Sequence, residues 1–259
     1  MAINKAKVLT ITSVRGGTGK TTTALNLAGL LSLKKEKTLL IDLDLYESAI
    51  GPLLNIQNEE NIYTLASDML NGYTKPIMSY ITKYNSYIDC LLAPNDPRRA
   101  ASVYSKSITD IIEKYRPNYD YIIIDTNYFM NDINLNVLDA SNMILYVIDN
   151  DLVSLKAMRS IGNIYNDIEK TNYKILINKS INKYKEKFDN FDLNNIIGNK
   201  INYILPSNFY QKNMGEYIKK GQILLLDNNI RKSNNKTLET FKNIINDLDK
   251  EVLKIEKIN

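Results

Sequence analysis

One stretch constrains this 259-residue chain more than any other, namely residues 14–22, with the sequence VRGGTGKTT. The residues before it, 7–13, read KVLTITS, a β-branched run typical of a buried strand. After it, residues 21–33 place small and aliphatic side chains at helical spacing. A strand, a glycine-rich turn and a helix together bind anions, because glycines let backbone N–H groups converge and the helix start adds unpaired donors. We therefore expect this turn to hold the phosphates of a nucleotide.

Side chains within the turn have distinct expected roles. The Lys20 ammonium can reach the β- and γ-phosphates, and the Thr21 hydroxyl is placed to ligate Mg²⁺. The motif is not the plain G-x-x-x-x-G-K-[ST] form, because Val14 stands where that form has its first glycine. The remaining predicted nucleotide-binding residues of the turn are Gly16, Gly17, Thr18, Gly19 and Thr22.

The composition narrows the class of protein and of bound cation. Hydrophobic residues at 44% and charged residues at 24% are typical of a globular protein, and no apolar run resembles a signal peptide or a membrane span. The single cysteine, Cys90, excludes an internal disulfide, so we predict a cytoplasmic protein. The absence of histidine excludes histidine catalysis and histidine metal sites, which leaves oxygen ligands of the kind that Mg²⁺ prefers. A net charge of +4 permits anionic partners without requiring them.

Apolar strand-like runs alternate with amphipathic helical stretches along the whole chain, which is typical of a parallel sheet covered on both faces. The predicted strands are residues 7–13, 38–43, 87–93, 121–124, 143–148, 173–177 and 200–205. The predicted helices are residues 21–33, 98–115, 152–169, 208–219 and a C-terminal stripe from 238 to 252. Residues 48–83 read as loosely helical, and 179–198 as a polar loop with short helical pieces. We predict an α/β fold with one doubly wound, mostly parallel sheet of about seven or eight strands.

Three carboxylates stand at predicted strand ends, where ligands of open α/β sheets bind. They are Asp42, Asp44 and Asp125, and they would repel one another unless a cation lay between them. We predict Mg²⁺ there, held directly by Thr21 and through water by an acidic strand end, Asp42 or Asp125. Asp44 lies two residues beyond Asp42, so an extended chain would point both the same way, and one of the two could orient or deprotonate water. Each aspartate taken alone could equally cap a helix or a turn.

Several of these stretches together resemble the ParA/MinD ATPases, which are P-loop proteins with a deviant Walker A motif. They are residues 15–22 (RGGTGKTT), 40–44 (LIDLD) and 119–126 (YDYIIIDT). Asn178 and Lys179 resemble the Asn-Arg pair with which the family reads adenine, and Leu205-Pro206 precedes a helix as in the family. The resemblance covers nearly the whole chain. It implies ATP and Mg²⁺ as ligands, with Asn178, Lys179 and Pro206 on the nucleotide.

Within that family the chain is most similar to the ATPase domain of the CpaE/TadZ pilus-assembly proteins. The supporting stretches are residues 42–45 (DLDL), 91–99 (LLAPNDPRR) and 151–156 (DLVSLK). Leu45-Tyr46 stand where partition ParA proteins usually have Pro-Gln. CpaE/TadZ proteins often carry an N-terminal receiver-like domain, but here the phosphate-binding turn begins close to residue 1. We therefore expect a single P-loop ATPase domain over residues 1–259, without a receiver-like domain.

The resemblance implies an ATP-dependent homodimer in which the deviant lysine of each subunit reaches the phosphates held by the other. Arg15 occupies that position, and its planar guanidinium differs from a compact ammonium. It could act as a finger on the γ-phosphate, or hold the dimer while hydrolysis stays slow. The expected catalytic residues are thus Asp44, Lys20 and Arg15. Asn127-Tyr128 replace the proline pair usual after the Walker B strand, where the switch segment begins.

Four functions are compatible with these features. The leading hypothesis is an ATPase switch that positions a pilus or secretion assembly, with recruitment to a cell pole or a membrane-associated complex. The second is an ATP-binding scaffold with little hydrolysis. The third is DNA partition, with candidate DNA contacts at Lys212, Lys219, Lys220, Arg231 and Lys232. The fourth is a MinD-like membrane switch, which is disfavoured because the C-terminal helix alternates acidic residues with lysines on its polar face, so we expect no direct membrane contact.

Overall fold

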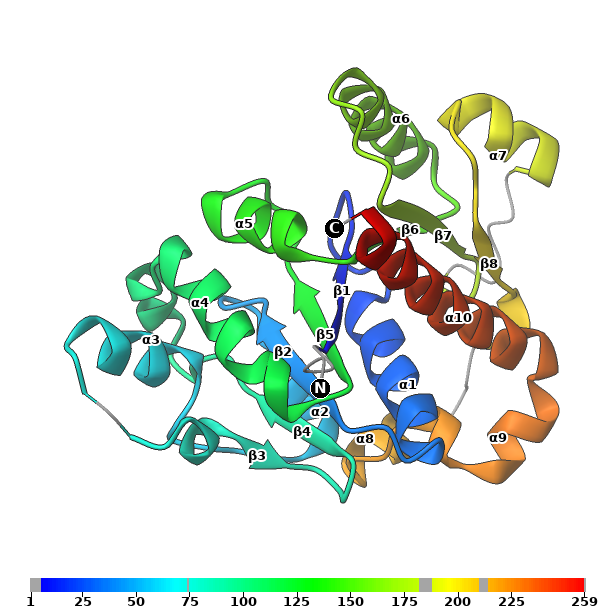
Figure 1. The fold of residues 1–259 in the computed structure, drawn as a ribbon. Coiled ribbons are helices and arrows are strands. Elements are labelled where there is room, and N and C mark those ends of the chain that lie inside the picture. Colours follow the sequence, from blue (N-terminus) through cyan, green and yellow to red (C-terminus); the bar gives the residue numbers. More distant parts are fainter. Residues whose placement is uncertain (1–5, 74, 182–187, 210–213, 259) are drawn as a thin grey trace.

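The computed structural model describes residues 6–73, 75–181, 188–209 and 214–258 (Figure 1). The strands are β1 (Lys7–Thr12), β2 (Thr38–Leu43), β3 (Thr82–Lys83), β4 (Ile88–Leu91), β5 (Tyr121–Thr126), β6 (Met143–Asp149), β7 (Tyr173–Asn178) and β8 (Tyr203–Leu205). The α-helices are α1 (Lys20–Leu33), α2 (Ile50–Leu54), α3 (Ile62–Leu70), α4 (Ser105–Tyr115), α5 (Asp132–Ala140), α6 (Leu152–Asp167), α7 (Asn190–Ile197), α8 (Met214–Lys219), α9 (Asn228–Ser233) and α10 (Asn235–Ile258).

All eight strands form one sheet in the order β3-β4-β2-β5-β1-β6-β7-β8. Every neighbouring pair is parallel except β3 with β4. β1 lies between β5 and β6, so the chain winds outward from the centre in both directions, and the carboxyl ends of the parallel strands meet at one edge. The predicted doubly wound, mostly parallel sheet is confirmed.

Helices cover both faces of the sheet (Figure 1). α1 and α10 pack on one face, where Leu27 and Phe241 belong to the same buried cluster as Leu145 of β6. The opposite face is covered by α3 to α7 through two further clusters. The strands are buried on both sides, which explains why they read in the sequence as continuous apolar runs.

α10 is also fixed to the sheet by polar contacts. The Asp249 carboxylate accepts hydrogen bonds from the Tyr121 hydroxyl and the Lys7 ammonium, each at 2.8 Å. This long helix therefore closes the core on the side of α1. Within the described residues, no helix is long and apolar enough to cross a membrane.

The predicted helix over residues 98–115 is only partly correct. Its first part is a 3₁₀ turn (Pro97–Ser102), and the α-helix begins at Ser105. The reason is local: Asp96 accepts a hydrogen bond from the Arg98 N–H, and Val103 then adopts an extended backbone that ends the turn. Within residues 48–83 the structure contains two short α-helices, a 3₁₀ turn and the antiparallel edge strand β3.

Other differences lie at element ends. β5 continues through Asp125 and Thr126, so Asp125 is a residue of the strand rather than the cap beyond it. The helix α5 was not predicted, and the polar stretch 179–198 contains α7. Both helices are short and begin at a polar capping side chain, Asn131 for α5 and Asp189 for α7.

Candidate active site

The turn between β1 and α1 has the backbone geometry of an anion-binding loop. Gly17 and Gly19 have φ angles of 75° and 91°, in the left-handed region that other residues rarely adopt. A Cβ on Gly19 would also lie 2.6 Å from Nδ2 of Asn178, so a side chain there would collide with its neighbour. Gly19 is the N-cap of α1, and no side chain caps this helix. The first amide groups of α1 therefore point toward the turn and can bind a ligand.

Lys20 and Thr21 begin α1 and lie beside the end of β5. Lys20 is only 8% exposed, and its ammonium forms no ion pair within the described part of the chain. The Thr21 hydroxyl donates a hydrogen bond to Oδ2 of Asp125, with an oxygen–oxygen distance of 2.5 Å. Asp125 is fully buried, and among the described residues its Oδ1 has no hydrogen-bond partner. A buried carboxylate oxygen without a donor fits a site for metal-bound water, with Thr21 as the direct ligand.

Asp42 lies opposite Asp125 on the neighbouring strand β2 and is also fully buried. Its Oδ1 accepts a hydrogen bond from the Asp44 N–H at 3.1 Å. Its Oδ2 accepts bonds from the Ser48 hydroxyl at 2.9 Å and the Ile50 N–H at 3.1 Å. The Asp42 carboxylate therefore organises the loop between β2 and α2, and its metal role stays a prediction. No group of three or more acidic or cysteine side chains with metal-binding geometry occurs in the ranges that the structure describes.

Asp44 lies just beyond β2, which ends at Leu43. The chain is extended as far as Leu43, and the Asp44 N–H donates to the side chain of Asp42. The predicted common direction of the Asp42 and Asp44 side chains stays a prediction. Asp44 lies near Lys20: burial raises the pKa of the Asp44 carboxyl group, and the positive charge of Lys20 opposes this shift.

Burial raises the pKa of the three predicted site aspartates, Asp42, Asp44 and Asp125. The pKa of Asp125 rises to about 8, with the charge of Asp42 as the next cause, while the bond from Thr21 and the charge of Lys20 oppose the shift. The pKa of Asp42 rises to about 6 because of burial, partly offset by its hydrogen bonds. At neutral pH Asp125 therefore retains a proton unless a cation stabilises the ionised form.

Asn178, at the end of β7, packs against the glycine-rich turn. Its Nδ2 donates to the carbonyl of Thr18 at 3.0 Å, and its Oδ1 accepts from the N–H and hydroxyl of Ser180. An amide has two N–H donors, so one remains for a ligand. A cavity of about 200 Å³ with a partly apolar wall adjoins it. Its lining residues are Gly19, Thr22, Thr23, Asn178, Ser180, Ile181, Leu205, Phe209, Met214 and Leu224.

Lys179 and Pro206 lie next to this cavity in the sequence but do not line it. The Lys179 N–H donates to the carbonyl of Leu205 at 3.0 Å, which continues the pairing of β7 with β8. The carbonyl of Pro206 accepts from the Phe209 N–H at 3.1 Å and begins a 3₁₀ turn. Both residues shape the backbone around the cavity, and their contact with a nucleotide stays a prediction.

Arg15 and Gly16 form the opposite end of the turn. The Arg15 guanidinium donates to Asp151 at 3.3 Å, and both side chains are partly exposed. Asp151 also caps α6 by accepting a bond from the Val153 N–H. The ring of Tyr128 lies over Gly16, with Cε1 3.6 Å from the position of a Cβ. The sequence does not predict that Asp151 and Tyr128 contact this turn.

A larger cavity, of about 610 Å³, lies elsewhere, between α3 and the segment after β4. Its lining includes Glu60, Asp68, Lys75 and Asp96, and none of the predicted site residues. Lys75 is paired with Glu60 at 2.7 Å and Asp68 at 3.4 Å. Of the predicted site residues, Gly19, Thr22 and Asn178 line the smaller cavity beside the turn.

Known proteins and a protein family have sequences similar to this chain. A family described as an AAA domain (AAA_31) matches residues 6–183. The tyrosine-protein kinase CpsD of Streptococcus pneumoniae is 35% identical over 127 residues, which are 48% of this chain and 53% of that protein. The chromosome partitioning protein ParA of Myxococcus xanthus is 28% identical over 159 residues, 59% of this chain and 55% of that protein. The chain thus spans about half the length of these curated relatives.

Solved structures share the fold over almost the full chain. The septum site-determining protein MinD of Pyrococcus horikoshii, solved in complex with Mg-ADP, superimposes with a TM-score of 0.73 at 18% identity, over 98% of both chains. At this identity the likeness concerns the fold, while the family match covers well over half of the sequence. The chain shares the fold of this MinD structure and belongs to the AAA_31 family of AAA domains.

Proposed function

We propose that the chain binds Mg-ATP and acts as a nucleotide-switched, homodimeric ATPase that positions a larger assembly. One observation carries the proposal: the Thr21 hydroxyl is bonded to the buried Asp125 carboxylate directly beside Lys20 and the glycine-rich turn. A lysine, a metal-ligating hydroxyl and an acidic strand end are the three groups that phosphoryl transfer at a P-loop needs.

Each group has a defined part in this chemistry. A bound magnesium ion supplies charge neutralisation for the phosphates, and the Mg-ADP complex of the MinD structure supports this choice of metal. Thr21 would bind the ion directly and Asp125 through water. Lys20 stabilises negative charge on the outer phosphates. Asp44 lies near Lys20 and has a raised pKa, so it is suited to orient the attacking water and to accept its proton.

Arg15 is the candidate contact with the second subunit. Its ion pair with Asp151 is half exposed to solvent, and such pairs contribute only about 0–1 kcal/mol. Release of Arg15 from Asp151 therefore costs little, and the guanidinium can then reach phosphates held by a second copy. The competing proposal is an ATP-binding dimeric scaffold with little hydrolysis, in which Arg15 holds the dimer without accelerating the reaction.

We further propose that the larger assembly positioned by this protein is a pilus or secretion machine. The three stretches that resemble CpaE/TadZ proteins begin at the ends of β2 and β4 and just after β6, so all three lie at the carboxyl edge of the sheet, where a partner could sense the nucleotide. Of these, residues 91–99 contribute Asn95, Asp96 and Arg99 to the lining of the large cavity.

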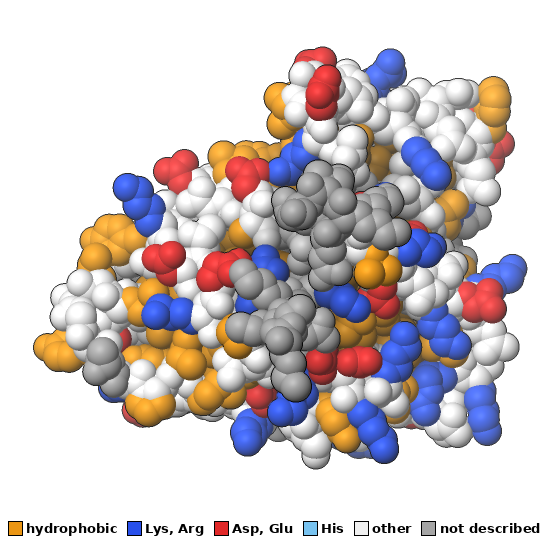
Figure 2. All heavy atoms as spheres, viewed as in Figure 1, with side chains coloured by type: hydrophobic (Ala, Val, Ile, Leu, Met, Phe, Trp, Pro, Cys, Tyr) orange, Lys and Arg blue, Asp and Glu red, His pale blue; other side chains and the backbone are white. Residues whose placement is uncertain are grey.

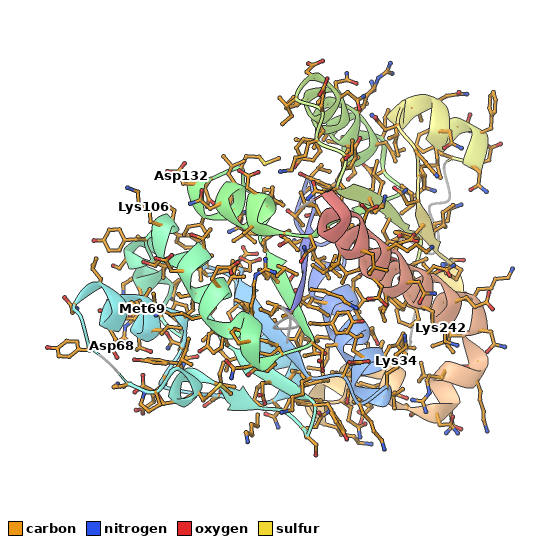
Figure 3. All side chains as sticks on the ribbon, in the orientation of Figure 1. Lys34, Asp68, Met69, Lys106, Asp132 and Lys242 are labelled. Atoms are coloured by element: carbon orange, nitrogen blue, oxygen red, sulfur yellow. The ribbon has the colours of Figure 1, made fainter. Side chains whose placement is uncertain are left out.

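DNA partition is the main alternative, and a basic surface favours it. Figure 2 shows Lys and Arg side chains gathered over α9 and the start of α10, and Figure 3 labels Lys34 and Lys242 on this side. The exposed lysines of α9 and the start of α10 are Lys232, Lys236 and Lys242, and the predicted DNA contacts Lys219 and Lys220 are exposed at the end of α8. Of the other predicted DNA contacts, Arg231 donates to the carbonyl of Leu225 at 2.6 Å, and Lys212 lies outside the described residues.

A membrane-switch role has less support. The apolar face of α10 is already used, because Phe241, Ile244, Ile245 and Leu248 are buried against the sheet. This arrangement leaves the polar face of α10 outward, which does not favour insertion of this part of the helix into a bilayer.

The proposed function is tested by nucleotide titration and phosphate release with purified protein. We expect Lys20→Ala to lose ATP binding and turnover, and wild-type protein to dimerise with ATP but not with ADP. Turnover that is absent from the wild type while ATP-dependent dimerisation persists would favour the scaffold. ATP-dependent DNA binding that weakens with salt would favour partition, because phosphate contacts release counterions. ATP binding that is unchanged in Lys20→Ala would refute the proposal.

A further inference from the structure

Tyr128 lies over the phosphate-binding turn without belonging to it. Its ring atoms Cε1 and Cδ1 are 3.6 and 3.9 Å from the position that a Cβ on Gly16 would occupy. The side chain is 40% exposed, and its hydroxyl forms no hydrogen bond within the described part of the chain. Among the described residues, a phenol donor without a hydrogen-bond partner thus lies beside the turn.

The backbone on both sides of Tyr128 is fixed by buried amides. Asn134 of α5 donates through Nδ2 to Oδ1 of Asn127 and to the carbonyl of Phe129, each at 2.6 Å. The Phe129 N–H donates to the same Oδ1 at 3.0 Å, and the Thr12 hydroxyl of β1 contacts the Asn127 carbonyl at 3.4 Å. The fold itself therefore holds Tyr128 beside the turn.

The position along the sheet indicates which part of a nucleotide Tyr128 would meet. Tyr128 follows β5 three residues after Asp125, the carboxylate on the metal side of the site. A magnesium ion held by Thr21 and Asp125 would lie beside the outer phosphates of a bound nucleotide. The cavity beside Asn178 lies beyond β1 and β6, at β7 and β8, so it is separated from Tyr128 by the turn. The outer phosphate of a bound ATP would therefore lie on the Tyr128 side.

We propose that Tyr128 is a specificity-determining residue, whose hydroxyl donates a hydrogen bond to the terminal phosphate of ATP and so distinguishes ATP from ADP. The inference rests on the proposed function, because it requires Mg-ATP in this site. A hydrogen bond to a charged phosphate is of the stronger class, and ADP offers no oxygen at that position.

The test is titration of the full chain with Mg-ADP and with a non-hydrolysable Mg-ATP analogue. In Tyr128→Phe, which keeps the ring on Gly16, we expect affinity for the ATP analogue to fall about tenfold, equivalent to about 1.4 kcal/mol, and ADP affinity to stay unchanged. The matched control is Tyr104→Phe, another exposed tyrosine that lies before α4, and it should bind both nucleotides as wild type does.

Three results would overturn the inference. They are an unchanged affinity of Tyr128→Phe for the ATP analogue, an equal loss for both nucleotides, and phosphate found covalently on Tyr128 after incubation with ATP, which would make it an acceptor. Lys20→Ala separates this inference from the proposed function. If Lys20→Ala binds ATP normally, the nucleotide site itself is wrong. If Lys20→Ala loses ATP while Tyr128→Phe behaves as wild type, only the role of Tyr128 is wrong.

Discussion

Replacement of Asp125 by asparagine should change how the stability of the nucleotide-free protein depends on pH. Burial raises the pKa of Asp125 to about 8 in the folded chain, whereas the ordinary value is 3.8. Between these pH values the folded chain keeps a proton that the unfolded chain has released. Stability must therefore fall as the pH rises through this range, and it stops falling above the folded-state pKa.

The size of the effect follows from the number of protons involved. A difference of one bound proton changes the unfolding free energy by about 1.4 kcal/mol per pH unit, or about 2.7 kcal/mol between pH 5 and pH 7. Asp42, with its pKa raised to about 6, adds a contribution of the same sign below pH 6. Asparagine cannot ionise. In Asp125→Asn the unfolding free energy should therefore lose the pH dependence that Asp125 contributes, whatever the absolute stability of the variant.

The assay is urea unfolding of wild type and Asp125→Asn at pH 5, 6 and 7, with a chelator present to remove metal ions. Asp110→Asn, a change at an exposed residue of α4, serves as the matched control and should follow the wild-type slope. A pH dependence of Asp125→Asn equal to that of the wild type would refute the reasoning, because it would mean that Asp125 is ionised in the folded protein without a cation.

Further changes test other parts of the site. Asp44→Asn should reduce ATP turnover at least a hundredfold while affinity for a non-hydrolysable ATP analogue changes less than about threefold, because the carboxylate acts on water rather than on binding. Asp151→Asn keeps the cap of α6 but weakens the hold on Arg15, so ATP-dependent dimerisation, measured by sedimentation, should strengthen by up to about fivefold. Gly19→Ala should lower the unfolding free energy by about 1–3 kcal/mol and weaken ATP binding, since alanine is strained at φ 91° and its Cβ meets a neighbouring side chain. Phe241→Ala, in the core under α10, should cost about 3–5 kcal/mol in urea unfolding without changing the ATP:ADP affinity ratio of the remaining folded protein.

The central fold could be predicted because its strands are buried on both faces. Residues 38–43, 143–148 and 173–177 are apolar runs that need no partner information to be recognised as strands. The short elements could not be predicted in the same way. β3 has only two residues and exists through its pairing with β4, and α5 depends on the Asn131 cap and on contacts with α4. Such elements form because of tertiary contacts, which the secondary-structure propensity of the local sequence does not reveal.

The site could be predicted where recognisable motifs fix the geometry, and not where residues outside those motifs make the contacts. Thr21 and Asp125 were expected on a common metal and are bonded to each other. Ser48 was missed because its bond to Asp42 depends on how the loop after β2 turns. Asn134 was missed because a polar residue of a short helix carries no sign in the sequence that it holds Asn127.

The electrostatics of Asp125 connect the fold to the nucleotide cycle. The oxygens of this carboxylate can accept either a proton or the bonds that a metal-bound water would donate, and both stabilise the same buried group. Without a cation the raised pKa keeps the proton in place, so burial of Asp125 beside Asp42 is tolerated. Under the proposed function, Mg-ATP would displace that proton, and the ionised carboxylate would then have a cation to offset its burial. The site would thus favour ligands that bring a divalent cation, because such a cation stabilises the ionised form of Asp125.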